Sequence, residues 1–200
     1  MANIKLTKNE LKKQKDALKR YERYLPTLVL KKQQLQMVIR QVEAQERQKR
    51  HEKEAVKTKI DRWVAVFGEP ASLDELLGVE EVVTEIGNIA GVDIPVFKDI
   101  RFWETEYDLF ETPLWVDTAI EELKKLVALE EESRILREQA ELLNQELRIT
   151  SQRVNLFEKV KIPETRENIR TIQIYLGDQQ TAAVVRGKIA KKKLVEAESK

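Results

Sequence analysis

The sequence has 200 residues and is rich in charge but poor in aromatic side chains, with 36% charged and 6% aromatic residues. This composition argues against one large spherical core and favours long amphipathic helices, in which each residue has few neighbours. The absence of cysteine excludes disulfide frameworks, thiol catalysis and thiolate metal sites, and it fits a reducing, cytoplasmic compartment. We expect no membrane span and no signal peptide, because no apolar run approaches roughly 20 residues.

Charge is segregated along the chain although the net charge is only +1. Residues 1–60 contain 17 basic and 7 acidic side chains, residues 61–132 contain 5 and 19, and residues 133–200 contain 14 and 9. Both ends are therefore basic and the middle is acidic. Basic ends raise the alternative of a nucleic-acid-binding helical hairpin, but the aromatic residues that would stack on bases are concentrated in the acidic middle.

A long helix is predicted to begin at Thr7. Thr7 and Glu10 have the spacing of a capping box, in which each side chain accepts a hydrogen bond from the other residue's backbone N–H. Apolar residues then recur at alternating intervals of three and four up to residue 67, with a polar interval through Glu46, Lys49 and Lys53. This spacing predicts a coiled-coil seam formed by Leu11, Leu18, Tyr21, Leu25, Leu28, Lys32, Leu35, Ile39, Val42, Val56, Ile60, Trp63 and Phe67.

The middle of the chain, residues 68–113, has a different periodicity. Gly68 and Pro70 end the first helix, and residues 72–77 read as a short helix capped by Ser72. Residues 81–97 are rich in β-branched side chains with glycine punctuation, which predicts one or two short strands joined by a turn. Two interpretations remain for the aromatic stretch of residues 100–115. It closes the far end of a helical hairpin as a small apolar cap, or it also exposes a surface to a partner.

A second long helix is predicted from residue 114. At roughly 1.5 Å per residue the two helices span on the order of 85 and 120 Å, so the C-terminal helix should extend beyond its antiparallel partner by some 30 Å. That extension contains small, polar and basic residues. The predicted seam of this helix consists of Leu126, Leu129, Ser133, Leu136, Ala140, Leu143, Leu147, Thr150, Val154, Phe157, Ile169, Ile172 and Leu176.

Two prolines fall inside the predicted helices. At Pro26 the alternatives are a kink and a break into two helices, and the apolar series favours a kink because its phase is kept across the proline. Pro163 has no N–H to donate to the carbonyl of Lys159, and its ring crowds that carbonyl, so we expect a bend.

No pattern in the sequence indicates catalysis or a cofactor. The Gly187-Lys188 pair has Ala182 where a phosphate-binding loop requires its first glycine. His51 is the single histidine and lies among charged residues, which favours a solvated surface role over a metal site. We therefore expect a protein without catalytic, cofactor-binding or metal-binding residues.

These observations predict a mainly α fold, a long antiparallel two-helix coiled coil with a small central cap that contains a short helix and a β-hairpin. The segments are residues 1–67, 68–113 and 114–200 of a single elongated domain. The pattern alone leaves the function open among a coiled-coil scaffold, a prefoldin-like chaperone and a rotor.

Three motifs, in order along the chain, carry a resemblance to a known family. They are Thr-Lys-x-Glu-Leu at residues 7–11, Asn-Ile-x-Gly-Val-x-x-Pro at residues 88–95 and Arg-Val-Asn-x-x-Glu-x-x-x-Ile-Pro at residues 153–163. Together they resemble the D subunit of V-type rotary ATPases and ATP synthases.

The resemblance implies a non-catalytic central rotor shaft that is monomeric when isolated and peripheral on the membrane. It would couple ATP hydrolysis or synthesis in a hexamer of A and B subunits to proton or sodium ion translocation by a membrane ring. Its other partners would be the F subunit and the adaptor of that ring, and it would make no direct contact with nucleotide or nucleic acid. The expected bearing residues are Thr7, Leu11, Thr181, Ala182, Arg186, Lys188, Lys191 and Lys192, and the expected partner-facing cap residues are Asn88, Gly91, Pro95, Phe102 and Trp103.

Overall fold

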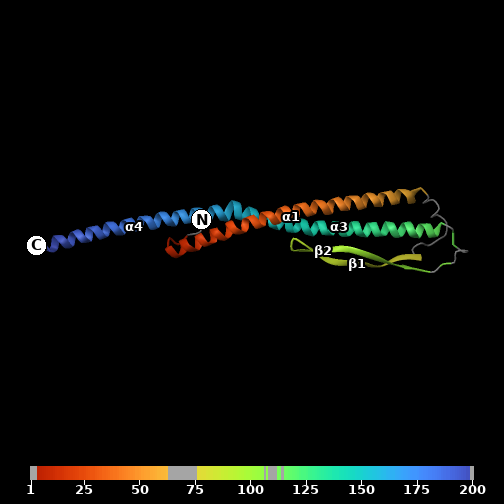
Figure 1. The fold of residues 1–200 in the computed structure, drawn as a ribbon, viewed down its shortest axis with the longest axis horizontal. Helices are drawn as coiled ribbons and strands as arrows, with labels where there is room; N and C mark the ends of the chain where they lie inside the picture. Colours follow the sequence, from red (N-terminus) through yellow and green to blue (C-terminus); the bar gives the residue numbers. More distant parts are fainter. Residues whose placement is uncertain (1–3, 63–75, 106, 108–111, 114, 199–200) are drawn as a thin grey trace. The chain divides into compact units, whose positions relative to one another are not determined.

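The computed structural model describes residues 4–62, 76–105, 107, 112–113 and 115–198. Within these residues the helical elements are α1 (Lys8–Asp61), α3 (Val116–Leu156), η2 (Phe157–Lys161) and α4 (Ile162–Glu198), with the strands β1 (Leu77–Ile89) and β2 (Val92–Glu104) between α1 and α3 (Figure 1). The chain forms two compact units, residues 1–30 with 150–200 and residues 31–149. The predicted mainly α fold with a central β-hairpin is confirmed.

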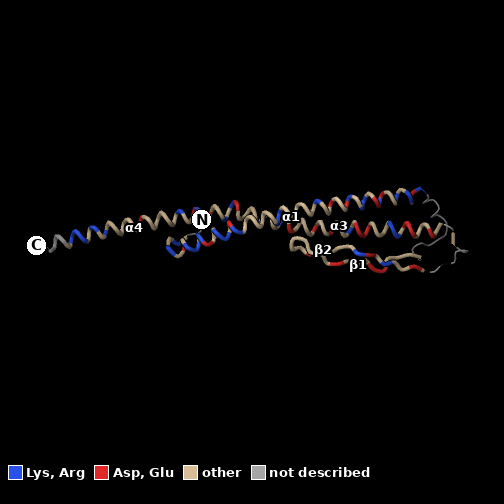
Figure 2. The backbone as a smooth tube through the Cα atoms, viewed as in Figure 1, with Lys and Arg blue, Asp and Glu red and all other residues tan. Residues whose placement is uncertain are grey.

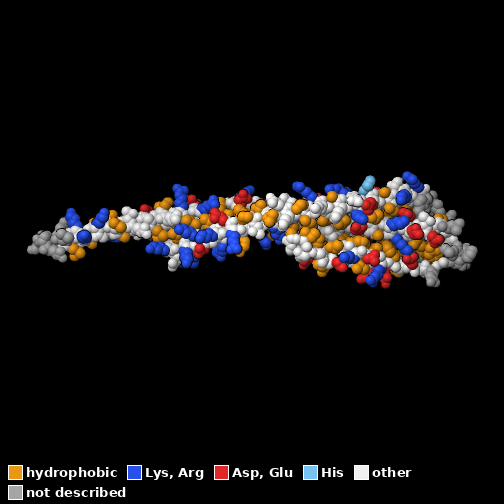
Figure 3. Space-filling model, in the orientation of Figure 1, with side chains coloured by type: hydrophobic (Ala, Val, Ile, Leu, Met, Phe, Trp, Pro, Cys, Tyr) orange, Lys and Arg blue, Asp and Glu red, His pale blue; other side chains and the backbone are white. Residues whose placement is uncertain are grey.

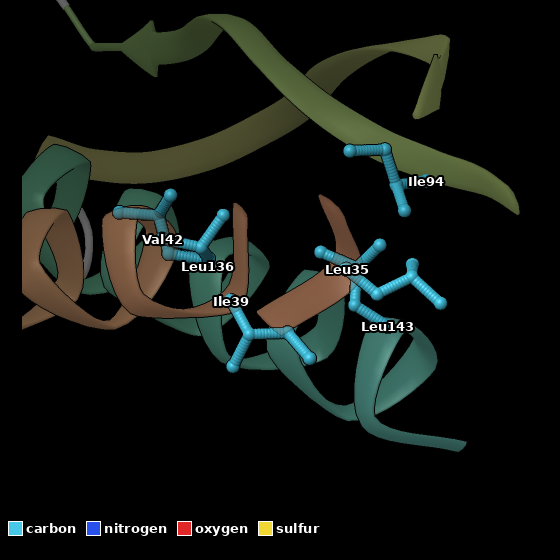
Figure 4. Close-up of a cluster of buried hydrophobic side chains, with 6 residues drawn as sticks. All are labelled: Leu35, Ile39, Val42, Ile94, Leu136 and Leu143. Carbon is cyan, nitrogen blue, oxygen red and sulfur yellow. The ribbon is translucent and has the colours of Figure 1, made fainter. Parts of the chain in front are cut away.

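In the unit of residues 31–149, α1 and α3 bury the predicted seam against each other. Leu35, Val42 and Leu143 are buried, and they form one apolar cluster with Ile39, Leu136 and Ile94 (Figure 4). The predicted seam residues Leu129 and Leu147 are half-buried, and Ile60 is buried near the end of α1. The alternating intervals of three and four therefore identified the contact face of both helices.

The β-hairpin is antiparallel, and a two-residue turn joins its strands. Ala90 and Gly91 both have positive φ, 53° and 78°, as the central residues of a type I′ turn require. Asn88 supports this turn, because its Oδ1 accepts from the Gly91 N–H at 3.1 Å and its Nδ2 donates to Asp93 Oδ1 at 2.6 Å. Each strand has 13 residues, so the sheet is longer than the predicted strands and includes Phe102 and Trp103.

The hairpin packs along the helix pair and not only at its end. Ile94 of β2 is 2% exposed and belongs to the cluster with Leu35 and Leu143. The Nε2 atom of Gln139, on α3, donates to the Pro95 carbonyl at 2.5 Å, which ties the strand to the helix. The short helix predicted at residues 72–77 falls almost entirely outside the described residues, and Leu77 begins β1.

In the other unit, the first part of α1 packs on the end of α3, η2 and the first part of α4. The rings of Tyr21 and Phe157 lie 5.2 Å apart between centroids, and Arg166 pairs with Glu22 at 2.8 Å. The predicted seam residues Leu11, Leu18 and Leu28 of α1 are half-buried. On the opposite helix the buried side chains are Thr150, Val154, Ile162, Thr165 and Ile172.

Helix α1 begins at one half of the predicted capping box and continues through Pro26. The Thr7 hydroxyl accepts from the Glu10 N–H at 3.2 Å, which confirms one half of the capping box. The other half was wrong, because the Glu10 carboxylate accepts from Gln14 Nε2 at 2.9 Å and the Thr7 N–H donates to the Lys5 carbonyl. Helix α1 runs through Pro26 without a break, so the break into two helices is excluded and the kink stays a prediction.

The helix immediately before Pro163 is not a regular α-helix, and the predicted bend at Pro163 stays a prediction. Residues Phe157–Lys161 form a π-helical turn, in which the Ile162 N–H donates to the Phe157 carbonyl. The C-terminal helix therefore consists of α3, this wider turn and α4. The predicted division at residues 67/68 and 113/114 stays a prediction, because both boundaries touch residues outside the described part.

Candidate functional site

The end of α4, residues 177–194, carries large apolar side chains that the described chain leaves exposed. Ile172 is fully buried and Leu176 half-buried, but Val184, Ile189 and Leu194 are 58%, 52% and 66% exposed. In Figure 3 hydrophobic and basic side chains both lie on the surface of this segment. A helix of exposed apolar and basic residues offers a surface to another protein.

Six of the predicted bearing residues lie in this segment, which is also basic. Its only acidic residue is Asp178, and Figure 2 shows Lys and Arg gathered toward its end. The Thr181 hydroxyl donates to the Gly177 carbonyl at 3.1 Å, so it is satisfied within the helix. Ala182 is half-buried, and the other four are exposed: Arg186, Lys188, Lys191 and Lys192.

The two remaining bearing residues lie at the start of α1. Thr7 is exposed and acts as the N-cap, whereas Leu11 is half-buried in the seam. The helix around them is strongly basic, with seven Lys and Arg and three acidic residues over residues 8–23. Both parts of α1 and α4 that carry the predicted bearing residues therefore present positive charge to solvent.

The polar interval in the α1 seam faces complementary charges on α3. Lys49 Nζ lies 3.1 Å from Glu132 Oε2, and Lys53 pairs with Glu130. The Glu132 hydrogen bond raises the pKa of Lys49, and the hydrogen bond from Lys53 lowers the pKa of Glu130. The same stretch also contains the contacts of Glu46 with Arg137 Nε at 3.1 Å and with Ser133 Oγ at 3.3 Å, and α1 and α3 are further joined by Lys31 and Glu146 at 2.7 Å.

The predicted cap residues are spread along the hairpin and do not form one cluster. Asn88 and Gly91 build the turn, and the Pro95 carbonyl binds Gln139. Phe102 is half-buried, while Trp103 is 42% exposed and lies so close to Gly78 that a Cβ there would clash with its ring.

Sequence reasoning missed the most protruding apolar residue of the hairpin. Ile86 is 84% exposed and pairs with Pro95 across the sheet. Strict alternation could have found it, because its neighbour Gly87 pairs with the buried Ile94 and successive residues point to opposite faces.

Among the residues that the structure describes, no group of three or more His, Cys, Asp or Glu side chains could hold a metal ion. His51 is exposed on α1, as predicted. A search of the same residues found no helix that is long and apolar enough to cross a membrane. The candidate functional features that the exposed side chains indicate are surfaces: the end of α4, the start of α1 and the outer face of the hairpin.

Comparison with known proteins gives matches over nearly the whole chain. The family model described as the ATP synthase D subunit matches residues 10–192. The V-type ATP synthase D subunit of Borreliella burgdorferi is 53% identical over 195 residues, which cover 98% of this chain and 96% of that protein. The protein of the same name from Chlamydia caviae is 36% identical over 196 residues, covering 96% and 94%.

Proposed function

Since the chain belongs to the family of ATP synthase D subunits, we propose that it is the central rotor shaft of a V-type ATP synthase or ATPase. In this role it couples ATP hydrolysis or synthesis in the hexamer of A and B subunits to proton or sodium ion translocation by the membrane ring. The shaft itself is non-catalytic, and its attachment to the membrane is peripheral, through the complex.

The observation that carries this proposal is the exposed end of α4. Among the side chains of α4 described up to Leu194, the last fully buried one is Ile172, yet the helix continues to Glu198 and exposes apolar side chains beyond Ile172. Val184, Val185, Ile189 and Leu194 are all exposed on this one segment, and such a group of apolar side chains indicates a surface that a partner covers. We assign this partner to the centre of the A/B hexamer, with Thr7, Leu11 and the predicted bearing residues of α4 at the contact.

The proposed mechanism depends on the mismatch between one asymmetric shaft and three catalytic interfaces, and on a weak contact between them. A single chain inside a hexamer with three catalytic interfaces cannot touch all three alike, so it favours a different nucleotide state at each. Rotation then moves this bias from one interface to the next, which couples the angle of the shaft to nucleotide affinity. Small side chains such as Ala182 and Ala183 with flexible lysines suit a contact that must be released at every step.

The hairpin is proposed as the other contact region. It carries the acidic middle of the chain and exposes Ile86, Val79 and Trp103 at 84%, 43% and 42%. Apolar side chains within an acidic surface suit a protein partner with a basic rim. We assign this face to the F subunit and to the adaptor of the membrane ring.

Truncation after Leu176 tests the proposal. The shortened chain retains Ile172 and the contacts of Tyr21 and Glu22, so its folding should be maintained. Assembled with an A/B hexamer and the F subunit, it should show ATP turnover that is no longer coupled to sustained rotation. A chain ending at Leu194 is the matched control and should behave as the full chain. Unchanged rotation after truncation at Leu176 would exclude the end of α4 as the bearing contact.

A further inference from the structure

The π-helical turn η2 lies where the apolar stripe of the C-terminal helix changes phase. Thr150, Val154 and Phe157 follow intervals of four and three, and Ile162, Thr165, Ile169, Ile172 and Leu176 continue with intervals of three and four. The step from Phe157 to Ile162 is five residues, one more than the alternation requires. The extra residue coincides with η2, whose Ile162 N–H donates to the carbonyl five residues back.

An uninterrupted α-helix would place the wrong residues on α1. Counted on from Phe157 at intervals of four and three, the seam would continue at Lys161, Glu164, Asn168 and Thr171. Glu164 and Thr171 are exposed and the other two only half-buried, whereas Ile162, Thr165 and Ile172 are buried. One residue corresponds to a rotation of about 100° in an α-helix. The wider turn therefore rotates α4 so that its apolar stripe stays on α1.

Contacts on both sides of η2 keep this phase. Tyr21 packs on Phe157, the first residue of η2, and the adjacent Glu22 pairs with Arg166 after it. The Thr165 hydroxyl donates to the Lys161 carbonyl at 2.6 Å, which closes the turn on the α4 side. Neighbouring residues of α1 thus hold the helix both at η2 and beyond it.

Pro163 does not by itself select the wider turn. Because proline has no N–H, one carbonyl loses its partner in either register, that of Glu158 in the π register or that of Lys159 in the α register. Pro163 is therefore compatible with η2. The burial of the apolar side chains Ile162 and Ile172, on either side of Pro163, is the larger effect, because removal of apolar surface from water is the main stabilising contribution.

We propose that η2 is a phase joint: a one-residue insertion, held as a π turn by the seam on both sides, that re-phases α4 onto α1. This inference concerns the fold of one helix pair and does not rest on the proposed rotor function.

Three variants of the full chain test the joint. Pro163→Ala should retain the bond from the Ile162 N–H to the Phe157 carbonyl in its crystal structure. Deletion of the exposed Lys159 in the Pro163→Ala background should convert η2 to regular α-helix, with Ile162, Thr165 and Ile172 still buried and Tm within about 4 °C of Pro163→Ala.

Deletion of the exposed Asn144 in the same background is the matched control. This deletion rotates the helix between residue 144 and η2, so that Leu147, Thr150 and Val154 no longer face α1. Because these side chains lose their packing, Tm should fall by more than about 8 °C. The proposal is overturned if Pro163→Ala alone yields a continuous α-helix, or if deletion of Lys159 lowers Tm as much as deletion of Asn144.

Discussion

Lys49 on α1 and Glu132 on α3 form an ion pair, with Nζ 3.1 Å from Oε2, inside the polar interval of an otherwise apolar seam. Both side chains are about a third exposed, at 30% and 28%. Solvent screens such a pair, so it contributes on the order of 0.2–1 kcal/mol. Its position suggests a second role, because opposite charges at matched seam positions disfavour a shifted pairing of the helices.

Exchanging the two charges of this pair should show whether their attraction itself stabilises the fold, independently of which helix carries which charge. Lys49→Glu places like charges opposite each other and should lower the free energy of unfolding by about 1 kcal/mol. The double variant Lys49→Glu with Glu132→Lys should recover most of that loss. Urea unfolding at low and high salt measures both. If the double variant is no more stable than the single one, the pair does not help to set the helix pairing.

The lowered pKa of Glu130 predicts a weakness toward acid. A carboxylate whose pKa is lower in the folded than in the unfolded state stabilises the fold above its ordinary pKa of 4.5, and that contribution is lost as pH falls through the folded pKa. Glu130→Gln should therefore reduce stability at pH 7 but have a smaller effect below pH 4. Unfolding curves at the two pH values test this, and an equal loss at both would refute it.

The raised pKa of Tyr107 predicts a loss of stability at alkaline pH. Its hydroxyl donates to the Asp117 carboxylate at 2.5 Å, which raises the pKa of Tyr107 from 10.0 to about 12. The contribution of this bond is complete below pH 10 and disappears as pH rises through about 12. The wild type should lose more stability over this range than Tyr107→Phe, which has no phenol to ionise. Parallel declines of the two proteins would contradict the assignment.

The helix pair could be predicted from the sequence because a coiled-coil seam places apolar residues at regular intervals of three and four. Leu35, Val42 and Leu143 were found from spacing alone and are buried. The same spacing does not predict Ile135 and Gln139, although both are buried, because α3 has a second buried face under the hairpin and a coiled-coil seam accounts for one face only. The predicted seam does not reveal the π turn either, because its residues before and after Pro163 each keep the intervals of three and four, and only the spacing between the two groups shows the extra residue.

The surface predictions depend on a resemblance more than on spacing. Charge and small side chains marked the end of α4, but only the resemblance of three motifs suggested what covers it. Ile86 escaped notice because the strands were expected to be short, and a hydrophobic residue in a strand is usually counted as core.

A matched pair of hairpin variants should distinguish core from contact surface. Ile94 is 2% exposed and Ile86 is 84% exposed, on opposite faces of one sheet. Ile94→Ala should lower the free energy of unfolding by about 2–5 kcal/mol, whereas Ile86→Ala should change it by less than about 0.5 kcal/mol. In binding to the F subunit or to the ring adaptor the order should reverse for folded protein, with Ile86→Ala the weaker binder. If Ile86→Ala binds both partners as tightly as the wild type, the outer face of the hairpin is not the contact surface proposed above.

The glycines provide a last prediction with opposite signs at two positions. Gly91 has φ +78° in the hairpin turn, where an L side chain is strained, so Gly91→Ala should destabilise the protein by roughly 1 kcal/mol although space is available. Gly177 lies in α4, where an added Cβ would have nothing within 4 Å, and Gly177→Ala should stabilise the helix by about 0.5–1 kcal/mol. Helix content by circular dichroism and urea unfolding test both. Gly177 begins the exposed segment, so Gly177→Ala also tests the proposed contact with the A/B hexamer. Unchanged rotation with higher helix content would support a contact that depends on the shape of the helix. Lost rotation would mean that the contact requires glycine at residue 177.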